Sequence, residues 1–360
     1  MHVAGTRLVI ASGELARAGD DRVHIGTRAA ADWDRRIVDS ALSTGFAEAM
    51  ATLGQHPFFV DDDRDIALLL VRRLPVPGLR SLTSRIKVYV NHGRQAFLWR
   101  LLDQLAARGA GYVLLGDPGR PLPNHLAGDG AGFDVTTHHR VVHDVRRDDD
   151  ALIAGMHLKA RWQIRRAVRD GVAVSEITGE DDLADYCRLA AATAARIRQR
   201  NLVAALPDAF FRTILRTMVP RGQARFLIAR IDGRPLAGAL FLMSPDRMTY
   251  YHGVSTRDPA LTPIQGPSAI VWHAMRQARD DGRRWFDHGA VTVTADPEHP
   301  HHSVYLFKRR FGGHVETAAT GTLVLSRTKL AFQEHVMMPA WRRYYPLYLR
   351  LMGARPAPAV

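Results

Sequence analysis

The sequence predicts an α+β protein in which one structural unit occurs twice. Each half contains a hairpin of two apolar strands, then a helix that closes on a glycine, then a strand that carries an acidic residue. The two units also have nearly the same length, since Phe59 lies 58 residues before Asp117 and Phe226 lies 61 residues before Asp287. Because order and spacing both match, we interpret the halves as a duplication with mixed central sheets flanked by helices.

The elements of the first half follow one another directly along the chain. Apolar runs predict strands over 56–60 and 66–74, which are joined by an acidic turn. Apolar residues at helical spacing predict a helix over 93–110. A strand over 111–118 ends the unit and contains Asp117.

The second half repeats this order. Strands are predicted over 224–230 and 235–243 around a turn of sequence IDGR. A helix over 267–283 follows, and a strand over 284–291 carries Asp287. For this aspartate we expect a structural, capping role.

The junction between the halves is predicted near residue 148. A stretch rich in glycine and proline, 119–134, is followed by the charged segment 144–150. We therefore assign the first domain to 1–148 and the second to 149–329. The aromatic, amphipathic tail 330–360 is expected to pack back on the first domain as a helix. A helix on a membrane surface is the alternative, which Pro339 and Pro346 disfavour.

Composition narrows the class of protein. Of 360 residues, 46% are hydrophobic and the mean hydropathy is −0.15, and no apolar run is long enough to span a bilayer. The single cysteine, Cys187, excludes an intramolecular disulfide and a cysteine-based metal site. The N-terminus does not fit a signal peptide. We predict a cytoplasmic protein and a monomer.

Basic residues gather on one predicted helix. The formal net charge is +13, and arginine (45) far outnumbers lysine (4). Five cations lie in the stretch before Gly171: Lys159, Arg161, Arg165, Arg166 and Arg169. Offsets of four place Arg161, Arg165 and Arg169 on one face, with Trp162 and Ile164 turned elsewhere. Such a face favours contact with nucleic-acid phosphates, and a solvated surface is the alternative.

One lysine stands in an unusual setting. Lys308 follows Phe307 and precedes a Gly312–Gly313 turn. A lysine offers a compact charge that can lie against a developing oxyanion. A strand and turn with a solvated basic edge is the alternative explanation.

Four segments together resemble the Fem family. They are the basic helix KARWQIRRAVRDGVAV, the strand YYHGVS (250–255), the strand FDHGAV and the motif YLFKRRFGGHV. The resemblance covers about residues 30–330 and is strongest in the second half. Fem proteins are non-ribosomal peptidyl transferases with two GNAT-like (acetyltransferase-like) domains, and they move an amino acid from aminoacyl-tRNA to an amine.

The resemblance implies roles for individual residues. Lys308 and Phe307 match the family's catalytic motif, and Asp117 resembles its acid in the interdomain cleft. The basic helix is assigned to tRNA, and substrate contacts are assigned to Tyr250, Tyr251 and Arg196. Because alternation sends the two tyrosines to opposite faces, one of them could belong to the core instead. The aminoacyl ester is already activated, so no cofactor and no covalent enzyme intermediate is needed.

The sequence departs from the family where the acceptor is bound. The opening stretch TGFAEAMATLG has no basic residue, and NLVAALPDAFF is apolar where the family has an arginine. Within the resemblance, these departures favour a small peptide or natural-product amine as acceptor, as in antibiotic biosynthesis, rather than a nucleotide-linked cell-wall precursor.

Three other functions fit the sequence less well. A GNAT acyltransferase that uses acyl-CoA is the main alternative, although Pro263 stands where its pyrophosphate loop needs arginine or glutamine; Gly266 and Ser268 could still cradle an anion at the helix N-terminus. A pure RNA-binding module would explain the charge but not Lys308. A metal site at His299, His301 and His302 or at His138–His139 lacks regular ligand spacing, so no metal is expected.

Overall fold

The structure is a computed structural model, and it describes residues 23–72, 85–91, 94–117, 121–126, 133–198 and 206–332, with a few positions beyond them. The strands of the first half are β1 (His24–Gly26), β2 (Gln55–Asp61), β3 (Ile66–Arg72), β4 (Arg85–Val90) and β5 (Tyr112–Leu115). Those of the second half are β7 (Ala173–Glu176), β8 (Ala224–Ile231), β9 (Arg234–Met243), β10 (Arg247–Ser255) and β11 (Trp285–Val291). Two long strands, β6 (Asp134–Asp144) and β12 (His314–Val324), lie between them.

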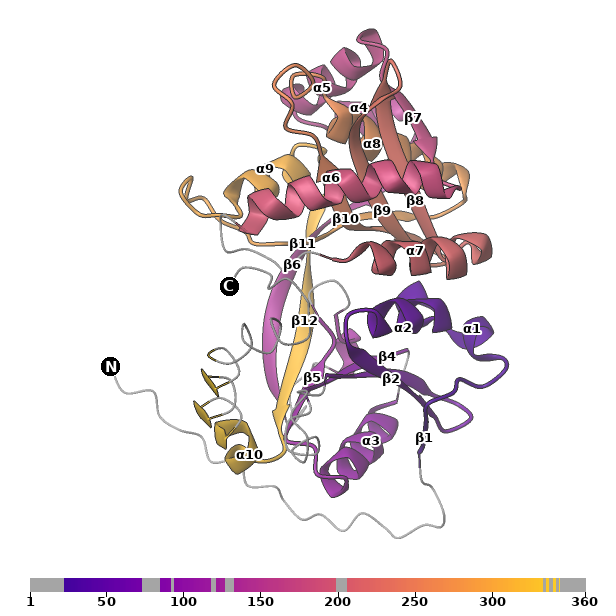
Figure 1. Ribbon diagram of the computed structural model, residues 1–360, viewed down its shortest axis with the longest axis vertical. Helices are drawn as coiled ribbons and strands as arrows, with labels where there is room; N and C mark the ends of the chain where they lie inside the picture. The colour runs from indigo at the N-terminus through magenta and orange to yellow at the C-terminus, as the bar shows by residue number, and fades with distance from the viewer. Residues whose placement is uncertain are drawn as a thin grey trace.

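All the described strands join in one sheet, and its order confirms the duplication. The order is β1-β2-β3-β4-β5-β12-β6-β11-β10-β9-β8-β7 (Figure 1). Each half runs from its edge strand to the centre in the order of its sequence, β1 to β5 from one edge and β7 to β11 from the other. In the first half β2, β3 and β4 are antiparallel and β5 is parallel to β4. In the second half β8, β9 and β10 are antiparallel and β11 is parallel to β10.

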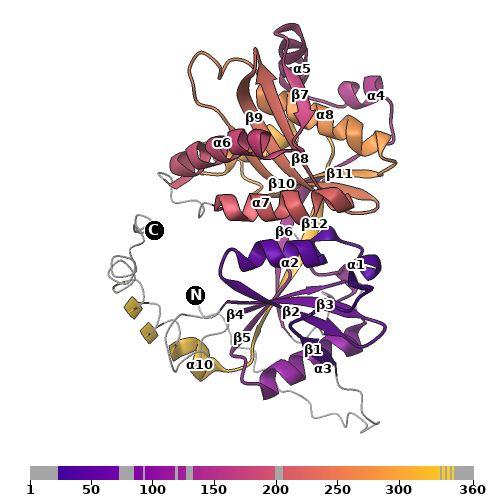
Figure 2. The ribbon, with the colours of Figure 1, turned by 45° about the vertical axis from the view of Figure 1, so that its right-hand side comes forward.

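The two central strands are exchanged between the halves. Strand β6 follows the first half in sequence, yet it pairs with β11 of the second half. Strand β12 follows β11 in sequence, yet it pairs with β5 of the first half. The two strands also pair with each other, in register from His314 opposite Val142 to Thr322 opposite Asp134. This ribbon runs along the long axis of the molecule in both views (Figures 1 and 2).

The helices cover both faces of the sheet. The first half contains α1 (Trp33–Arg36), η1 (Ser40–Leu42), α2 (Thr44–Ala51), α3 (Gln95–Ala107) and η2 (Asn124–Leu126). The second half contains α4 (Asp149–Ala154), α5 (Leu158–Arg169), α6 (Glu180–Arg198), α7 (Asp208–Thr217), η3 (Val219–Arg221), α8 (Gly266–Asp280) and α9 (His302–Arg309). Helix α10 (Arg327–Phe332) follows β12.

Buried apolar side chains of the described residues form three cores. One lies beneath α3 in the first half, and one lies among α4, α5, α8 and the sheet in the second half. The third is shared, because α2 and β3 of the first half pack against α6 and α7 of the second. In this shared core Phe210 of α7 stacks on Tyr251 at 6.1 Å, and Phe46 of α2 meets both rings edge to face.

Local sequence explains where several helices begin. Helix α2 follows Ser43, whose hydroxyl accepts the Phe46 amide, and α4 follows Asp148, whose carboxylate accepts the Ala151 amide. The predicted junction at residue 148 thus coincides with a helix N-cap. Because β6 and β12 each complete the other half's sheet, the division at this residue remains a prediction.

Strand β4 has no counterpart in the sequence analysis, because charged residues interrupt the apolar ones in its sequence RIKVYV. The Lys308 segment is a helix, α9, which excludes the alternative explanation of a strand there, and the predicted turn follows it at Gly312 (φ 91°) and Gly313 (φ 70°). The tail 330–360 lies mostly outside the described residues; just before it, the Nζ of Lys329 donates to the Gly109 carbonyl oxygen at 2.8 Å.

Candidate active site

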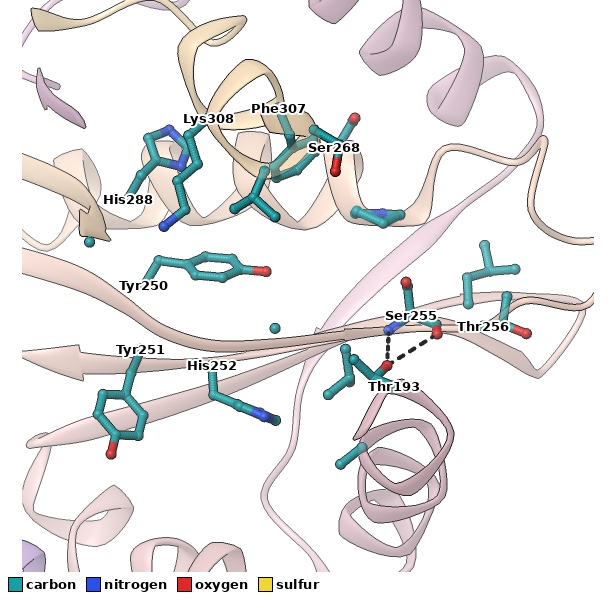
Figure 3. Close-up of a pocket in the computed structure, with 18 of the residues that line it drawn as sticks. Thr193, Tyr250, Tyr251, His252, Ser255, Thr256, Ser268, His288, Phe307 and Lys308 are labelled. Atoms are coloured by element: carbon teal, nitrogen blue, oxygen red, sulfur yellow. Dashed lines mark hydrogen bonds between the residues drawn. The ribbon is translucent and has the colours of Figure 1, made fainter. Parts of the chain in front are cut away.

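A cavity lies where two strands of the second half part. Strands β10 and β11 pair only from Arg247 opposite Trp285 to Thr249 opposite Asp287, after which β11 continues with β6 alone. A cavity of about 880 Å³ occupies the opening and reaches both faces of β10. Tyr250, Lys308, Phe307 and Ser268 line one side, and Tyr251, His252 and Thr193 line the other (Figure 3).

A bulge in β10 distributes these side chains. The register with β9 shifts between Tyr250, opposite Phe241, and His252, opposite Leu240. Tyr251 is the extra residue, so Tyr251 and His252 point to the same side, away from Tyr250 (Figure 3). With strict alternation along the strand, Tyr251 and His252 would point to opposite faces of β10.

Lys308 reaches the cavity from the last turn of α9. Its ammonium donates to the Ala290 carbonyl oxygen at 2.9 Å. Burial lowers the pKa of Lys308 to about 8, although the nearby carboxylate of Asp287 acts in the opposite direction and Arg140 adds to the lowering. Lys308 is therefore still mostly protonated at pH 7, and it is a stronger acid than an ordinary lysine.

Aromatic rings form the wall beside Lys308. Phe307 packs edge to face on Phe311 at 5.3 Å, and Tyr250 packs edge to face on Phe241 at 5.4 Å. Burial raises the pKa of Tyr250 to about 12, so its hydroxyl stays neutral. That hydroxyl lies so close to Gly253 that a Cβ there would come within 1.8 Å of it. Glycine at 253 is thus required for this position of Tyr250.

Behind Lys308 lies a buried ionic cluster that the sequence did not reveal. Asp287 is completely buried and forms ion pairs with Arg140 and, at 2.9 Å, with Arg247. It also accepts the Gly289 amide at 2.6 Å, which agrees with the expected capping role. Asp287 therefore links β6, β10 and β11 at the point where the strands part, and it supplies negative charge near Lys308.

Two neutral histidines extend this cluster. His288 lines the cavity, and its ring lies 5.0 Å from that of His143. Burial lowers the pKa of His143 to about 4 and that of His288 well below its usual value. Both imidazoles are thus uncharged at neutral pH. No sequence signal distinguished them from the other histidines of this chain.

The other predicted site residues lie at the far side of the cavity. Asp117 follows β5, lines the cavity and accepts the Tyr89 hydroxyl at 2.6 Å, while Lys87 lies 3.8 Å away. Tyr251 lines the cavity and also belongs to the shared core. Arg196 is on α6, and its side chain lies outside the described residues.

The basic helix α5 is exposed at one tip of the molecule (Figure 1). Lys159, Arg165 and Arg169 are exposed, whereas Arg161 donates to the carbonyl oxygens of Met156 and Ala154 and so caps α4. The expected trio on one face is therefore reduced to two arginines.

The remaining arginine of α5 has local partners. Arg166 binds Asp170 at 3.1 Å and lies over the Trp162 ring, 5.4 Å from its centroid. Trp162 itself is 49% exposed, so its ring is open to solvent, whereas Ile164 is buried.

The described residues offer no metal site. No three His, Cys, Asp or Glu side chains among them lie close enough together to hold a metal ion. Within the same part of the chain, none of the helices combines the length and the apolar character that a bilayer span requires.

Comparison with known proteins supports the fold. Residues 158–299 match the model of the acetyltransferase (GNAT) domain. A crystal structure of FemX is similar with a TM-score of 0.64 and 15% identity, over 81% of this chain and 93% of FemX. The chain has a Fem-like tandem GNAT fold. No curated protein sequence matches it.

Two other solved structures are similar over most of their length. The C-terminal domain of a putative lysylphosphatidylglycerol synthetase from Agrobacterium fabrum gives a TM-score of 0.56 and 14% identity, covering 82% of this chain and 92% of that one. L-PGS from Bacillus licheniformis gives a TM-score of 0.51 and 10% identity, covering 74% of this chain and 83% of that one. At these identities the likeness shows the Fem-like tandem GNAT fold alone, and the fold supports an acyltransferase.

Proposed function

We propose that this protein transfers an amino acid from aminoacyl-tRNA to the amine of a small peptide or natural-product acceptor, forming an amide bond. The observation that carries the proposal is Lys308, a part-buried cation in a cavity that opens on both faces of β10. A donor ester and an acceptor amine can thus approach the same point from opposite sides. Because aminoacyl-tRNA is found in the cytoplasm, this donor would place the reaction there.

The reaction is the aminolysis of an ester. The acceptor nitrogen attacks the carbonyl carbon, a C–N bond forms, and the carbonyl oxygen gains negative charge. The C–O bond to the ribose then breaks, the nitrogen loses one proton and the ribose oxygen gains one. The Lys308 ammonium stabilises the negative oxygen, and its lowered pKa suits it to protonate the leaving ribose oxygen.

The donor side of the cavity suits an RNA end. Helix α5 lines it through Gln163, and the same helix exposes Lys159, Arg165 and Arg169 to solvent. Cations on this helix can hold phosphates of an acceptor stem while the ester reaches Lys308.

The N-terminus of α8 weighs against acyl-CoA as donor. Binding a pyrophosphate there requires free amides, but Gly266 N donates to the Ile264 carbonyl and Ser268 N to that of Gln265. Between them Pro267 has no amide hydrogen. The Gln163 amide bonds the Gln265 side chain at 2.8 Å, so α5 is tied across the same position.

The acceptor side supports an amine that carries positive charge in solution. Asp39 and Asp117 of the first half are among the residues that line the cavity. Carboxylates at such an entrance attract an ammonium group and disfavour a diphosphate. A small peptide or amino sugar fits this better than a nucleotide-linked precursor.

The donor is tested by incubation with a mixture of radiolabelled aminoacyl-tRNAs and a panel of small amines, namely amino-acid amides, dipeptides and amino sugars. We expect label to appear in an amide product, and RNase treatment of the donor beforehand to abolish it. Radiolabelled acetyl-CoA with the same amines is the parallel arm. Transfer from acetyl-CoA together with none from any tRNA would contradict the proposal.

The acceptor class is tested by calorimetry with a UDP-linked muropeptide. We expect no binding at micromolar affinity and no aminoacylation of that nucleotide. Micromolar binding would restore a cell-wall precursor as the acceptor while leaving the tRNA donor in place.

A further inference from the structure

The acceptor side of the cavity contains an imidazole with one bonded and one open nitrogen. The Nδ1 of His252 lies 2.8 Å from the hydroxyl oxygen of Tyr186, which is fully buried in the shared core. The other nitrogen, Nε2, has no hydrogen bond within the described residues, although it belongs to a cavity-lining side chain. His252 therefore presents Nε2 to whatever enters from the side of Tyr251 and Thr193 (Figure 3).

The hydrogen bonds of Tyr186 define the tautomer of His252. The tyrosine hydroxyl has one hydrogen, and it lies 3.2 Å from the His252 carbonyl oxygen as well as 2.8 Å from Nδ1. A carbonyl oxygen can only accept. With the hydroxyl hydrogen directed at the carbonyl oxygen, the shorter contact is a hydrogen bond in which Nδ1–H donates to the hydroxyl. Nε2 then has no proton and is a free acceptor.

Tyr186 is held rigidly in this position. Its ring packs edge to face on Phe211 at 5.2 Å and on Phe226 at 5.1 Å, and a Cβ at Gly238 would come within 2.6 Å of it. On the cavity side, the Thr193 hydroxyl bonds both the amide and the carbonyl of Ser255, which holds the end of β10 against α6. The imidazole thus cannot turn without disturbing the core.

We propose that His252 is the base that removes the proton from the acceptor amine, and that Tyr186 is its positioning residue. This inference rests on the proposed function and adds a residue on the face of β10 opposite Lys308. Burial lowers the pKa of His252 to about 4, so the imidazole is neutral at pH 7 and able to accept.

The acceptor first loses the extra proton of its ammonium form to solvent and becomes a free amine, and two further protons then move in this scheme. Once the C–N bond begins to form, the attacking nitrogen carries positive charge and becomes acidic, and Nε2 of His252 takes one of its protons. Lys308 gives a proton to the ribose oxygen as the C–O bond breaks. After the products leave, imidazolium releases its proton to solvent and Lys308 regains one, so no other reactant is needed.

The tautomer is measurable without any substrate. Long-range ¹H–¹⁵N NMR on protein labelled with ¹⁵N-histidine, with His252 assigned from the spectrum of His252→Gln, distinguishes the two forms at pH 7. We expect Nδ1 protonated and Nε2 unprotonated in the wild type. Tyr186→Phe should raise the Nε2–H form, since it removes the acceptor of the Nδ1 proton. A wild-type His252 with its proton on Nε2 would overturn the proposal.

Kinetics test the role in transfer. His252→Gln should lower kcat for the aminoacyl-tRNA reaction about 100-fold or more, with KM for the tRNA unchanged, because loss of a general base costs roughly 10²–10⁴ in rate. Added imidazole should partly restore the rate of His252→Ala, which a merely structural histidine would not allow. The control is His56→Gln, an exposed histidine of β2, whose rate should equal that of the wild type.

The outcomes separate this proposal from the one on which it rests. A wild type that is inactive with every aminoacyl-tRNA would contradict the proposed function. If the wild type is active and a folded His252→Gln variant is equally fast, only the role of His252 as the base would be contradicted.

Discussion

At the scale of residues, Lys308 is the point where function and stability oppose each other. Its pKa of about 8 arises because burial penalises the charged amine, yet the charge is what the oxyanion needs. A protein optimised for stability alone would have an apolar residue at this position.

We expect Lys308→Ala to lower kcat by about 30- to 1,000-fold, since losing an oxyanion-stabilising group costs roughly 2–4 kcal/mol of barrier. Lys308→Arg should lower kcat less than Lys308→Ala, because the positive charge remains although the charged group has a different shape. Lys329→Ala is the matched control, as that lysine also donates to a backbone carbonyl but lies in α10, away from the cavity. Single-turnover rates measure the effect, and near-wild-type rates in Lys308→Ala would remove this residue from the mechanism.

The same residue predicts a stability change with the opposite sign. The folded-state pKa of Lys308 lies below the ordinary 10.5, so the charged amine destabilises the fold fully below pH 8 and less as pH rises toward 10.5. Lys308→Met should therefore raise the free energy of unfolding at pH 7 by about 1–2 kcal/mol, allowing for the lost bond to Ala290. Urea unfolding at pH 7 and pH 10 measures this, and the gain should shrink at the higher pH. An equal or lower stability at pH 7 would contradict the expectation.

At the scale of elements, α5 divides its cations between structure and solvent. Arg161 caps α4 and Arg166 is paired with Asp170. Lys159, Arg165 and Arg169 are exposed, and Arg169 also lies 3.6 Å from the Asp170 carboxylate. The exposed arginines lie beside Trp162, whose ring could also stack on an unpaired base.

We expect the double variant Arg165→Gln, Arg169→Gln to weaken tRNA binding and to flatten the slope of log affinity against log salt by about one to two units. The rate at saturating tRNA should change little, because these side chains do not contact the reacting ester. Arg161→Gln is the control; it should lower the thermal stability and leave the salt slope unchanged. Filter binding at several salt concentrations measures the slope, and an unchanged slope in the double variant would make this face a solvated surface.

The sequence predicted elements best where their apolar pattern was continuous. The helix at α3 and the strands β2, β3, β8 and β9 were all predicted nearly at their observed bounds. Strand β4 was missed because charged residues interrupt it. No helix was predicted at α9, although Val304, Phe307 and Phe311 follow helical spacing.

The site was predictable only in part, because tertiary contacts place its members. Lys308 stood out by composition, and the structure places it in the cavity with Phe307 and Tyr250. His252 could not be singled out, since its orientation depends on the bulge and on Tyr186, which is 66 residues away in sequence. The cluster around Asp287 likewise needs Arg140 from β6, which only the strand exchange brings near.

At the scale of the whole molecule, the halves are not independent. They share one core, one sheet and the exposed ion pairs Arg216–Glu48 and Arg221–Asp34. The cavity itself combines residues of both halves, with Asp39 and Asp117 from the first and the remainder from the second.

We therefore expect a single cooperative unfolding transition. In calorimetry the calorimetric and van't Hoff enthalpies should agree, which is unusual for two domains of this size. Phe210→Ala, which leaves a void between the halves, should lower the free energy of unfolding by about 3–5 kcal/mol and shift the whole transition. Two resolved transitions in the wild type would show that the halves unfold separately.

The exchange of β6 and β12 also has a consequence for synthesis on the ribosome. Strand β5 ends at Leu115, but its partner β12 begins only at His314. At roughly 5–20 residues per second, the intervening 200 or so residues take about 10–40 s to translate. Throughout that time the first half exposes an apolar edge of sequence YVLL, the kind of edge that recruits foreign strands. We therefore expect a chaperone or the protein's own β6 to cover this edge until β12 has emerged.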